Sequence, residues 1–151
     1  MNDKDEVLKL ENQLCFLLYA CARATTRYYR PYLEEMGLTY TQYLAMLVLW
    51  DEKQINLKTL GERLYLDSGT LTPVLKRLEE KGYITRERDT ADERNLILHV
   101  TDAGIVLKDE VYEIYQRMES WQPLSGEQNK LLKEMFVEAL EQYEAKEREK
   151  N

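Results

Sequence analysis

Apolar residues recur at helical spacing along most of the chain, and the period changes only in a short central stretch. A first helix is predicted from an apolar stripe made of Leu10, Leu14, Leu17, Leu18 and Cys21. Pro31 lacks a backbone N–H and is expected to disturb this helix. Gly37 is then expected to end the short turn that follows.

The middle of the chain carries three helix-start signals in close succession. Thr39 and Gln42 have the spacing of a capping box, which predicts a buried helix over residues 43–50. Asn56 can cap a short helix. A longer helix is expected to begin between residues 67 and 70 and to run to Gly82, with its regular part starting close before Pro73 or distorted there.

Two runs with strand character follow these helices. Residues 83–88 and 95–100 are expected to be extended, and residues 89–94 between them are polar and turn-prone. A short helix, a longer helix and two paired strands in this order define a winged helix-turn-helix. The sequence therefore predicts a mainly α protein with a small β wing.

The last third of the chain is predicted to be helical again. Thr101 can cap a long helix from Asp102 to about Glu119, which Pro123 follows. Residues 125–128 form a second capping box, Ser-Gly-Glu-Gln, which opens a terminal helix. Its apolar seam, which needs a partner surface, consists of Leu132, Phe136, Ala139 and Tyr143.

Composition and charge narrow the classes of function. The 151 residues are 44% hydrophobic, enough for the core of one domain, and the net charge is −7. Residues 57–100 carry 8 basic and 8 acidic side chains, whereas the flanking sections are acidic. A uniformly basic coat is therefore excluded, and any polyanion must meet a local basic patch.

No targeting or catalytic signal competes with this picture. The longest uncharged stretches, such as residues 14–22, fall far short of the ~18 apolar residues of a spanning helix, so a soluble, cytoplasmic chain without a membrane partner is expected. Two cysteines make no disulfide framework. His99 is the only histidine and cannot build a metal site alone, so no metal or cofactor is expected.

Three segments together resemble one family. The wing follows a pattern met by Asp92, Arg94, Leu98, Val100 and Thr101, in which Val100 replaces the usual leucine. Residues 10–19 resemble a segment with a reactive cysteine, and residues 66–73 resemble a recognition region. The chain thus resembles the MarR family of transcription regulators over nearly its whole length, in particular the OhrR branch, which senses organic hydroperoxides.

The resemblance implies a dimer on double-stranded DNA. Residues 1–151 would form one MarR-like subunit, with residues 57–100 as the winged helix-turn-helix and residues 1–36 and 102–151 as dimerisation helices. Such a homodimer would read a pseudo-palindromic operator.

Short hydroxyl side chains and nearby cations make up the predicted DNA-binding surface. Hydroxyls can donate to phosphates or base edges, and an arginine at a wing tip can enter a narrow minor groove. Asp92 is expected to orient Arg94 rather than to contact DNA. On charge alone, a solvated face with surface ion pairs would explain the basic residues. The complete predicted set is Ser68, Thr70, Thr72, Lys76, Arg77, Arg86, Arg88, Asp92 and Arg94.

Cys15 is the predicted redox sensor. No lysine, arginine or histidine lies within four residues of it to stabilise a thiolate, so a donor must come from elsewhere. The resemblance implies that hydroxyls of Tyr29 and Tyr40 reach it from the partner subunit, and Tyr19 on the same helical face could join them. This would use part of an excess of 11 tyrosines. In isolation, a cysteine in so apolar a run is a small core residue.

The second cysteine defines the expected chemistry. Cys21 lies six residues from Cys15, ~9 Å along and ~240° around a helix, so the two should not pair, and Cys21 is expected to be structural packing. The resemblance implies one-cysteine behaviour, because the family's two-cysteine members carry a resolving cysteine in the C-terminal part and this sequence has none there. Oxidised Cys15 would then proceed to a mixed disulfide with a low-molecular-weight thiol or to an overoxidised acid.

Three functions remain open at this point. The first is a repressor that releases its operator when an organic hydroperoxide oxidises Cys15. The second is a MarR-like regulator that responds to a small aromatic ligand or controls other genes, with Cys15 structural. The third is a thiol peroxidase, which would need turnover and a resolving route and would leave the winged module without a purpose.

Overall fold

The computed structural model describes residues 3–92, 94–118 and 124–150, which form seven α-helices, a 3₁₀ helix and three strands. They are arranged in two units, residues 1–114 and 115–151. In chain order the elements are α1 (Asp3–Val7), η1 (Leu10–Asn12), α2 (Leu14–Glu35), α3 (Tyr40–Glu52), β1 (Gln54–Asn56), α4 (Leu57–Leu64), α5 (Ser68–Glu80), β2 (Ile84–Arg88), β3 (Leu96–Val100), α6 (Asp102–Met118) and α7 (Gly126–Arg148).

Side-chain caps set the starts of the helices. The capping box of Thr39 is complete: its hydroxyl accepts from the Gln42 N–H at 3.2 Å, and the Gln42 amide oxygen accepts from the Thr39 N–H at 3.0 Å. Asn56 caps α4, and Asp67 caps α5. Gly37, after the end of α2, has φ +64°, a left-handed conformation that favours glycine. The predicted caps are confirmed, whereas Gly37 follows α2 itself and not a separate short turn.

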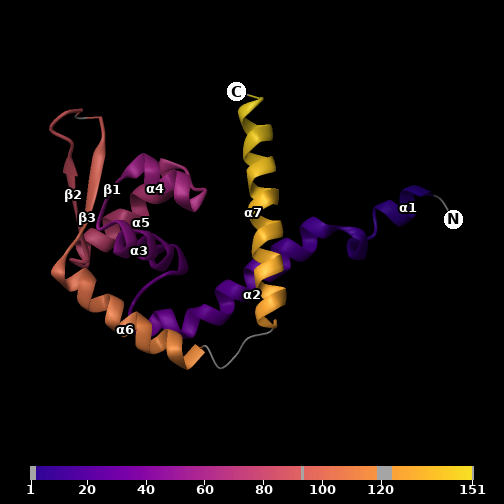
Figure 1. Cartoon of the computed structure of the whole chain (residues 1–151), viewed down its shortest axis with the longest axis horizontal. Helices are drawn as coiled ribbons and strands as arrows, with labels where there is room; N and C mark the ends of the chain where they lie inside the picture. The colour runs from indigo at the N-terminus through magenta and orange to yellow at the C-terminus, as the bar shows by residue number, and fades with distance from the viewer. Residues whose placement is uncertain (1–2, 93, 119–123, 151) are drawn as a thin grey trace. The chain divides into compact units, whose positions relative to one another are not determined.

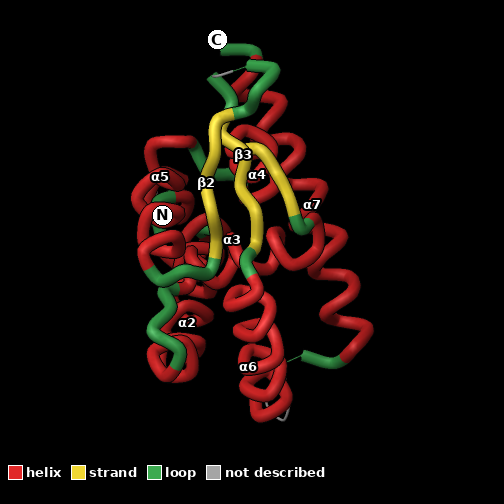
Figure 2. Tube along the Cα trace, turned by 90° about the vertical axis from the view of Figure 1, so that its left-hand side faces the viewer, coloured by secondary structure: helices red, strands yellow, loops and turns green. Residues whose placement is uncertain are grey.

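The sheet contains the two predicted strands and one more. β2 and β3 are antiparallel, with Ile84 opposite Val100, and they form a hairpin, drawn in Figure 2 as the yellow tubes labelled β2 and β3. β1 pairs with the other edge of β3, with Ile55 opposite Leu98, so the order is β1-β3-β2. The prediction of two strands therefore missed the third, which lies before residue 57.

One hydrophobic core holds the winged module together. In Figure 1, α3, α4 and α5 gather beside the sheet, and the β2–β3 hairpin projects beyond them. The core confirms the predicted buried helix over residues 43–50. Its largest fully buried side chains are Met46, Leu49, Leu60, Leu71, Leu75, Leu78, Ile84, Leu98 and Leu107.

A compact joint connects this module to the start of α6. The Trp50 indole N–H donates to the carbonyl of Gly104 at 2.7 Å in the interior. The Thr101 hydroxyl donates to the Gly82 carbonyl at 2.6 Å and accepts from the Gly104 N–H at 3.1 Å, so the predicted Thr101 cap is confirmed. A Cβ at Gly104 would lie 2.3 Å from the Tyr83 carbonyl oxygen, and only glycine permits this approach.

The helix α2 differs from the expectation at Pro31. It continues through this proline to Glu35. Pro31 is exposed, so the carbonyl that loses its intrahelical donor can turn to water, and the helix tolerates the loss. The predicted first helix also begins later than expected, because Leu10 belongs to the separate 3₁₀ helix η1.

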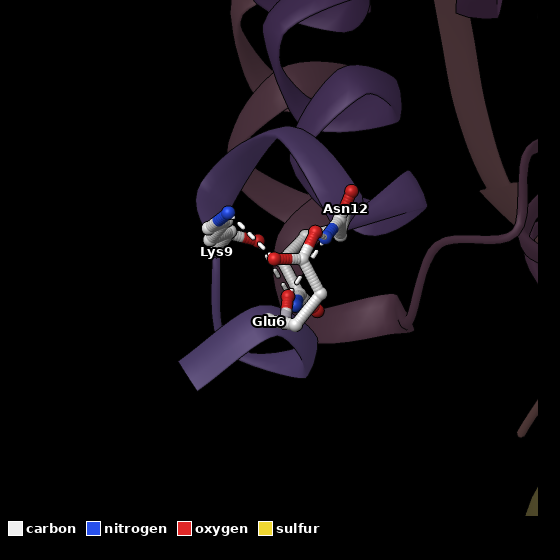
Figure 3. A network of polar contacts seen from close by, with 4 residues as sticks. Glu6, Lys9 and Asn12 are labelled. Atoms are coloured by element: carbon white, nitrogen blue, oxygen red, sulfur yellow. Dashed lines mark hydrogen bonds and ion pairs between the residues drawn. The ribbon is translucent and has the colours of Figure 1, made fainter. Parts of the chain in front are cut away.

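A small polar network holds the chain before α2. The Lys9 ammonium lies 2.6 Å from Oε2 of Glu6, and the Asn12 amide donates to Oε1 of Glu6 at 3.2 Å (Figure 3). These two donors, Lys9 first, hold the pKa of Glu6 below its ordinary value. Because the groups are exposed, the network contributes little to stability. Its main effect is to hold the local conformation of the chain before α2.

The C-terminal predictions are confirmed where they can be compared. α6 runs from Asp102 to Met118, and the predicted end at Glu119 and the following Pro123 lie outside the described residues. Ser125 caps α7 through a complete capping box with Gln128. The mainly α fold with a small β wing is therefore as expected.

Candidate DNA-binding and redox sites

Helix α5 turns one face to the core and the other outward. Leu71, Leu75 and Leu78 are fully buried, which fixes the rotation of the helix. The predicted DNA-contacting residues of this helix all lie on the exposed side: Ser68, Thr70, Thr72, Lys76 and Arg77. This arrangement presents the start of α5 in the way that a recognition helix requires.

The hydroxyls at the start of α5 are held by local hydrogen bonds. The Thr70 hydroxyl donates to Oδ2 of Asp67 at 2.8 Å, and the Thr72 hydroxyl donates to the Ser68 carbonyl at 2.6 Å. The Thr70 backbone N–H and then its hydroxyl hold the pKa of Asp67 below its ordinary value. The short side chains are thus ordered and leave the helix surface open to close approach.

The predicted wing-tip residues are paired as expected. Arg94 has a side chain 92% exposed, and its Nε lies 3.2 Å from Oδ1 of Asp92. The same carboxylate oxygen accepts from the Arg94 backbone N–H at 3.1 Å. The geometry matches the expectation that Asp92 orients Arg94, while the guanidinium remains accessible.

Arg86 has a different environment from Arg94, although both were predicted to serve DNA binding. Its Nε and terminal nitrogen lie 2.9 and 2.6 Å from Oε2 of Glu79, and only 22% of the side chain is exposed. Hydrogen bonding from Arg86 holds the pKa of Glu79 below its ordinary value. Arg86 therefore ties β2 to α5. Arg88, two residues on, lies exposed on the hairpin.

Cys15 lies exposed in the first turn of α2. The N-cap residue, Gln13, makes no side-chain cap bond, and its amide donates to the Val7 carbonyl at 2.6 Å instead. A helix N-terminus stabilises negative charge and is a setting in which cysteines become reactive. Cys21 is also exposed, so the expectation that it is core packing is wrong within this chain.

Five of the 11 tyrosines form a cluster that the sequence did not reveal. Ring centroids of Tyr29 and Tyr40 are 5.3 Å apart, those of Tyr29 and Tyr43 are 5.7 Å apart, and Tyr28 and Tyr32 continue the group at 6.1 and 5.8 Å. Burial raises the pKa of Tyr40 above its ordinary value. The cluster joins α2 to the start of α3.

The two predicted sensor tyrosines cannot reach Cys15 of their own chain through α2. Tyr29 is 14 residues beyond Cys15 on the same helix, or ~21 Å along its axis. Tyr40 packs against Tyr29, far from the first turn of α2. A contact between these hydroxyls and Cys15 therefore requires a second copy of the chain, as the resemblance implies.

Tyr19 has a partner that the sequence analysis missed. A terminal nitrogen of Arg23 donates to its hydroxyl oxygen at 3.3 Å, and the guanidinium carbon lies 5.5 Å from the centre of its ring. A hollow of about 230 Å³ on this face of α2 is lined by Phe16, Tyr19, Ala20, Arg23 and Arg27. The four-residue spacing of Tyr19 and Arg23 was the available signal.

Metal ligands and membrane-spanning helices were also sought in the described part of the chain. It holds no group of three potential metal ligands. His99 bonds to Glu87 on the neighbouring strand at 2.7 Å. No helix within residues 3–92, 94–118 and 124–150 is long and apolar enough to span a membrane.

Comparisons with known proteins place the chain in a family. The family model described as transcriptional regulator SarA/Rot matches residues 27–111. The organic hydroperoxide resistance transcriptional regulator of Bacillus subtilis is 47% identical over 141 residues, which cover 93% of this chain and 96% of that protein.

Solved structures agree. Reduced AbfR bound to DNA and overoxidized AbfR bound to DNA are each 38% identical, with a TM-score of 0.78 over 93% of this chain and 98% of the other. MarR itself is 28% identical, with a TM-score of 0.69 over 86% and 96%. The chain belongs to the SarA/Rot and MarR type of transcription regulators.

Proposed function

We propose that this protein is a homodimeric, DNA-binding transcriptional repressor that releases its operator when an organic hydroperoxide oxidises Cys15. The observation that carries the proposal is the position of Cys15, exposed at the uncapped start of α2. The similarity to an organic hydroperoxide regulator of Bacillus subtilis supports it. Its target places it in the cytoplasm, and it acts as a regulator rather than as a thiol peroxidase.

DNA binding is assigned to α5 and the wing. The exposed side of α5 enters a major groove, and Arg94 at the wing tip enters the adjacent minor groove. A homodimer sets two such modules about one DNA turn, ~34 Å, apart on a pseudo-palindrome. The capture of AbfR on DNA by crystallography supports this assignment. Arg86 contributes indirectly, because its bond to Glu79 holds strand β2 of the wing against α5.

The dimer is assigned to the terminal helices. Large apolar side chains are exposed on α2 and on α7, among them Leu17 at 51% and Phe136 at 41%. Exposed apolar side chains in such number mark an interaction surface. A second copy also supplies the Tyr29 and Tyr40 hydroxyls that the Cys15 thiolate lacks in its own chain.

The sensing step is nucleophilic attack on the peroxide. The Cys15 thiolate attacks the terminal oxygen of the hydroperoxide, the O–O bond breaks, and a new S–O bond gives the sulfenic acid. The leaving alkoxide takes a proton and departs as the alcohol. The apolar side chains of Phe16 and Leu17 beside Cys15 favour an organic group on the peroxide.

The released form is assigned to a mixed disulfide. A small thiol attacks the sulfenic sulfur, and water leaves as the disulfide forms. Overoxidized AbfR has been crystallised on DNA, so overoxidation did not prevent DNA binding in that protein. A bulky thiol adduct displaces the surrounding tyrosines more than added oxygens do. Cys21 lies too far around α2 to compete with that thiol.

The test uses a DNA duplex that the reduced protein selects from a random pool. Fluorescence anisotropy follows its release after one equivalent of an organic hydroperoxide, with and without a small thiol. Cys15→Ser should bind the duplex and ignore the peroxide, and Cys21→Ser should respond like the unaltered protein. If Cys15→Ser is released as readily, the sensor assignment is wrong and a ligand-responsive regulator takes its place.

Two side results sharpen the outcome. Tyr29→Phe or Tyr40→Phe should slow the response without loss of the dimer, because each removes a hydroxyl at nearly constant volume. Multiple turnovers of peroxide per subunit would instead favour a peroxidase.

A further inference from the structure

The turn between α4 and α5 contains a residue type that its backbone does not favour. Tyr65 follows the last residue of α4 and has φ +54°, in the left-handed region that ordinarily holds glycine. The N–H of Tyr65 donates to the Glu62 carbonyl at 3.4 Å. The N–H of Leu66 donates to the Gly61 carbonyl at 2.9 Å, which completes the bonding pattern of a Schellman motif. The left-handed conformation is therefore part of how α4 ends.

The same helix ending occurs after α2 and after α5, each time with glycine at the left-handed position. The residue is Gly37, with φ +64°, after α2 and Gly82, with φ +77°, after α5. In both cases the N–H of the following residue donates to the carbonyl five residues before it, at 2.9 and 3.0 Å. A tyrosine in this conformation is strained, and such strain is concentrated at functional sites. The presence of Tyr65 in the turn before α5 therefore needs a reason in its side chain.

The side chain of Tyr65 faces solvent on a fixed backbone. Leu64 and Leu66 on either side of it are half-buried and pack against the core, whereas Tyr65 is 49% exposed. Its ring and hydroxyl make no hydrogen bond or ring contact with the residues that the structure describes. A Cβ at Gly61 would lie 2.6 Å from the Leu66 carbonyl oxygen, so the turn packs closely on α4 and has little room to shift. The phenol is thus held in place and available to a partner.

The turn leads directly into the candidate recognition helix. Tyr65 precedes Ser68, the first residue of α5, by three positions, and Asp67 between them accepts from the Thr70 N–H at 2.9 Å. The path from Tyr65 to the first turn of α5 is therefore short and ordered. A helix whose start lies in a major groove places the turn before it beside the sugar-phosphate backbone. A tyrosine hydroxyl is one of the neutral donors that proteins direct at phosphate oxygens.

We propose that Tyr65 is a DNA-contact residue, whose hydroxyl donates a hydrogen bond to a phosphate at the edge of the groove that α5 enters. This rests on the proposed function for the assignment of α5 to the major groove. A phosphate contact carries no sequence information, so Tyr65 fixes the position of α5 on the duplex rather than its choice of bases.

The experiment measures binding of the reduced protein to the selected duplex by fluorescence anisotropy over a series of salt concentrations. Tyr65→Phe should weaken binding about tenfold, because the dimer loses two hydrogen bonds to charged phosphates. A duplex of scrambled sequence should lose affinity by the same factor. The slope of log K against log salt should stay unchanged, because a neutral phenol displaces no counterion, and this distinguishes Tyr65 from a cationic contact such as Arg94.

A second variant separates the side chain from the backbone. Tyr65→Gly relieves the left-handed strain, so the thermal midpoint should rise by a few degrees while DNA binding falls at least as far as in Tyr65→Phe. Lys53→Gly is the matched control, because Lys53 also has a positive φ, +62°, but lies at the end of α3. This control should raise the midpoint as well and leave the affinity for the duplex nearly unchanged.

Two results would overturn the proposal. Equal affinities of Tyr65→Phe and the parent would show that the hydroxyl meets no phosphate. A loss confined to the selected duplex would show that Tyr65 reads bases and not the backbone. Both results require a parent protein that binds the duplex, so they leave the proposed function intact. A parent that selects no duplex from the random pool would instead disprove the assignment of DNA binding to α5, and this inference with it.

Discussion

The winged module and the helix α2 are built on opposite plans. In the module, α3 and α5 bury whole rows of side chains, including Met46, Leu49 and Leu75 at 0% exposure. In α2, which is longer than either, Leu33 is the one buried residue. The module therefore completes its core within one chain, whereas α2 has an apolar surface that needs a second chain.

The same contrast separates the two sites. The candidate DNA-contacting residues of α5 are positioned by a core behind them, so one chain suffices to set their geometry. Cys15 is exposed in the single chain, and in the proposed sensor the hydroxyls of Tyr29 and Tyr40 come from a second copy. One subunit therefore combines a DNA-binding module with a complete core and a candidate redox site that needs a second copy.

The largest expected effect is at Leu75. Leu75→Ala leaves a cavity behind α5 and should lower the free energy of unfolding by about 2–5 kcal/mol. Leu17→Ala, at a position 51% exposed in the single chain, should instead weaken the dimer. Urea denaturation at fixed protein concentration and sedimentation equilibrium would distinguish the two. If Leu75→Ala and Leu17→Ala lowered the unfolding free energy of monomeric samples equally, the contrast between the winged module and α2 would be wrong.

The second-largest effect is expected at Gly104, where the start of α6 packs against the winged module. A Cβ at Gly104 would meet the Tyr83 carbonyl at 2.3 Å and a Val100 methyl at 2.8 Å, so Gly104→Ala should cost about 1–3 kcal/mol. Gly126, at the start of α7, has no atom within 4 Å of an added Cβ. Gly126→Ala is therefore the matched control and should not lower the thermal midpoint. A similar drop for both would remove the steric explanation.

A smaller effect, on DNA binding, is expected for substitutions in the wing. Arg94→Ala should weaken binding to the selected duplex and lower the slope of log K against log salt by about one, since one phosphate contact is lost. Arg86→Ala removes the ion pair with Glu79 and should lower the free energy of unfolding. The slope of log K against log salt should remain nearly unchanged. A salt series followed by anisotropy would measure both. Equal slopes for Arg94→Ala and the parent would exclude Arg94 from the interface.

The smallest expected effect is the pH dependence of the α5 cap. Bonds from Thr70 lower the pKa of Asp67 in the folded chain relative to ~3.9 in the unfolded one. The stabilisation is therefore complete above that value and is lost as the pH falls through the folded pKa. Asp67→Asn keeps an acceptor for the Thr70 N–H but should show a flatter stability curve below about pH 4. An identical acid limb would contradict the cap assignment.

Local chemistry made most of the fold predictable from the sequence. The caps at Thr39, Asn56 and Ser125 depend on neighbours within three residues, and the glycines after α2 and α5 depend on backbone sterics alone. The candidate DNA residues of α5 stay a prediction, and the sequence could not show that Arg86 pairs with Glu79, because that contact depends on how β2 packs on α5.

Features that depend on distant or absent partners could not be predicted in this way. The strand β1 has three residues and exists only because β3 pairs with it. The contacts of Tyr29 with Tyr40 and Tyr43 depend on how α2 packs on α3. Cys21 is exposed, although its place in the predicted apolar stripe suggested burial.

The joint at Thr101 makes α6 a lever. Trp50 and Thr101 fix the first turn of this helix to the module, so a tilt of the helix is not absorbed where it begins. Its 17 residues form a rod ~25 Å long, and a tilt of about 10° about the far end moves the near end by ~4 Å. That displacement exceeds the ~3.4 Å rise between successive base pairs. A tilt of about 10° at the dimer helices is thus enough to put one recognition helix out of register with its half-site.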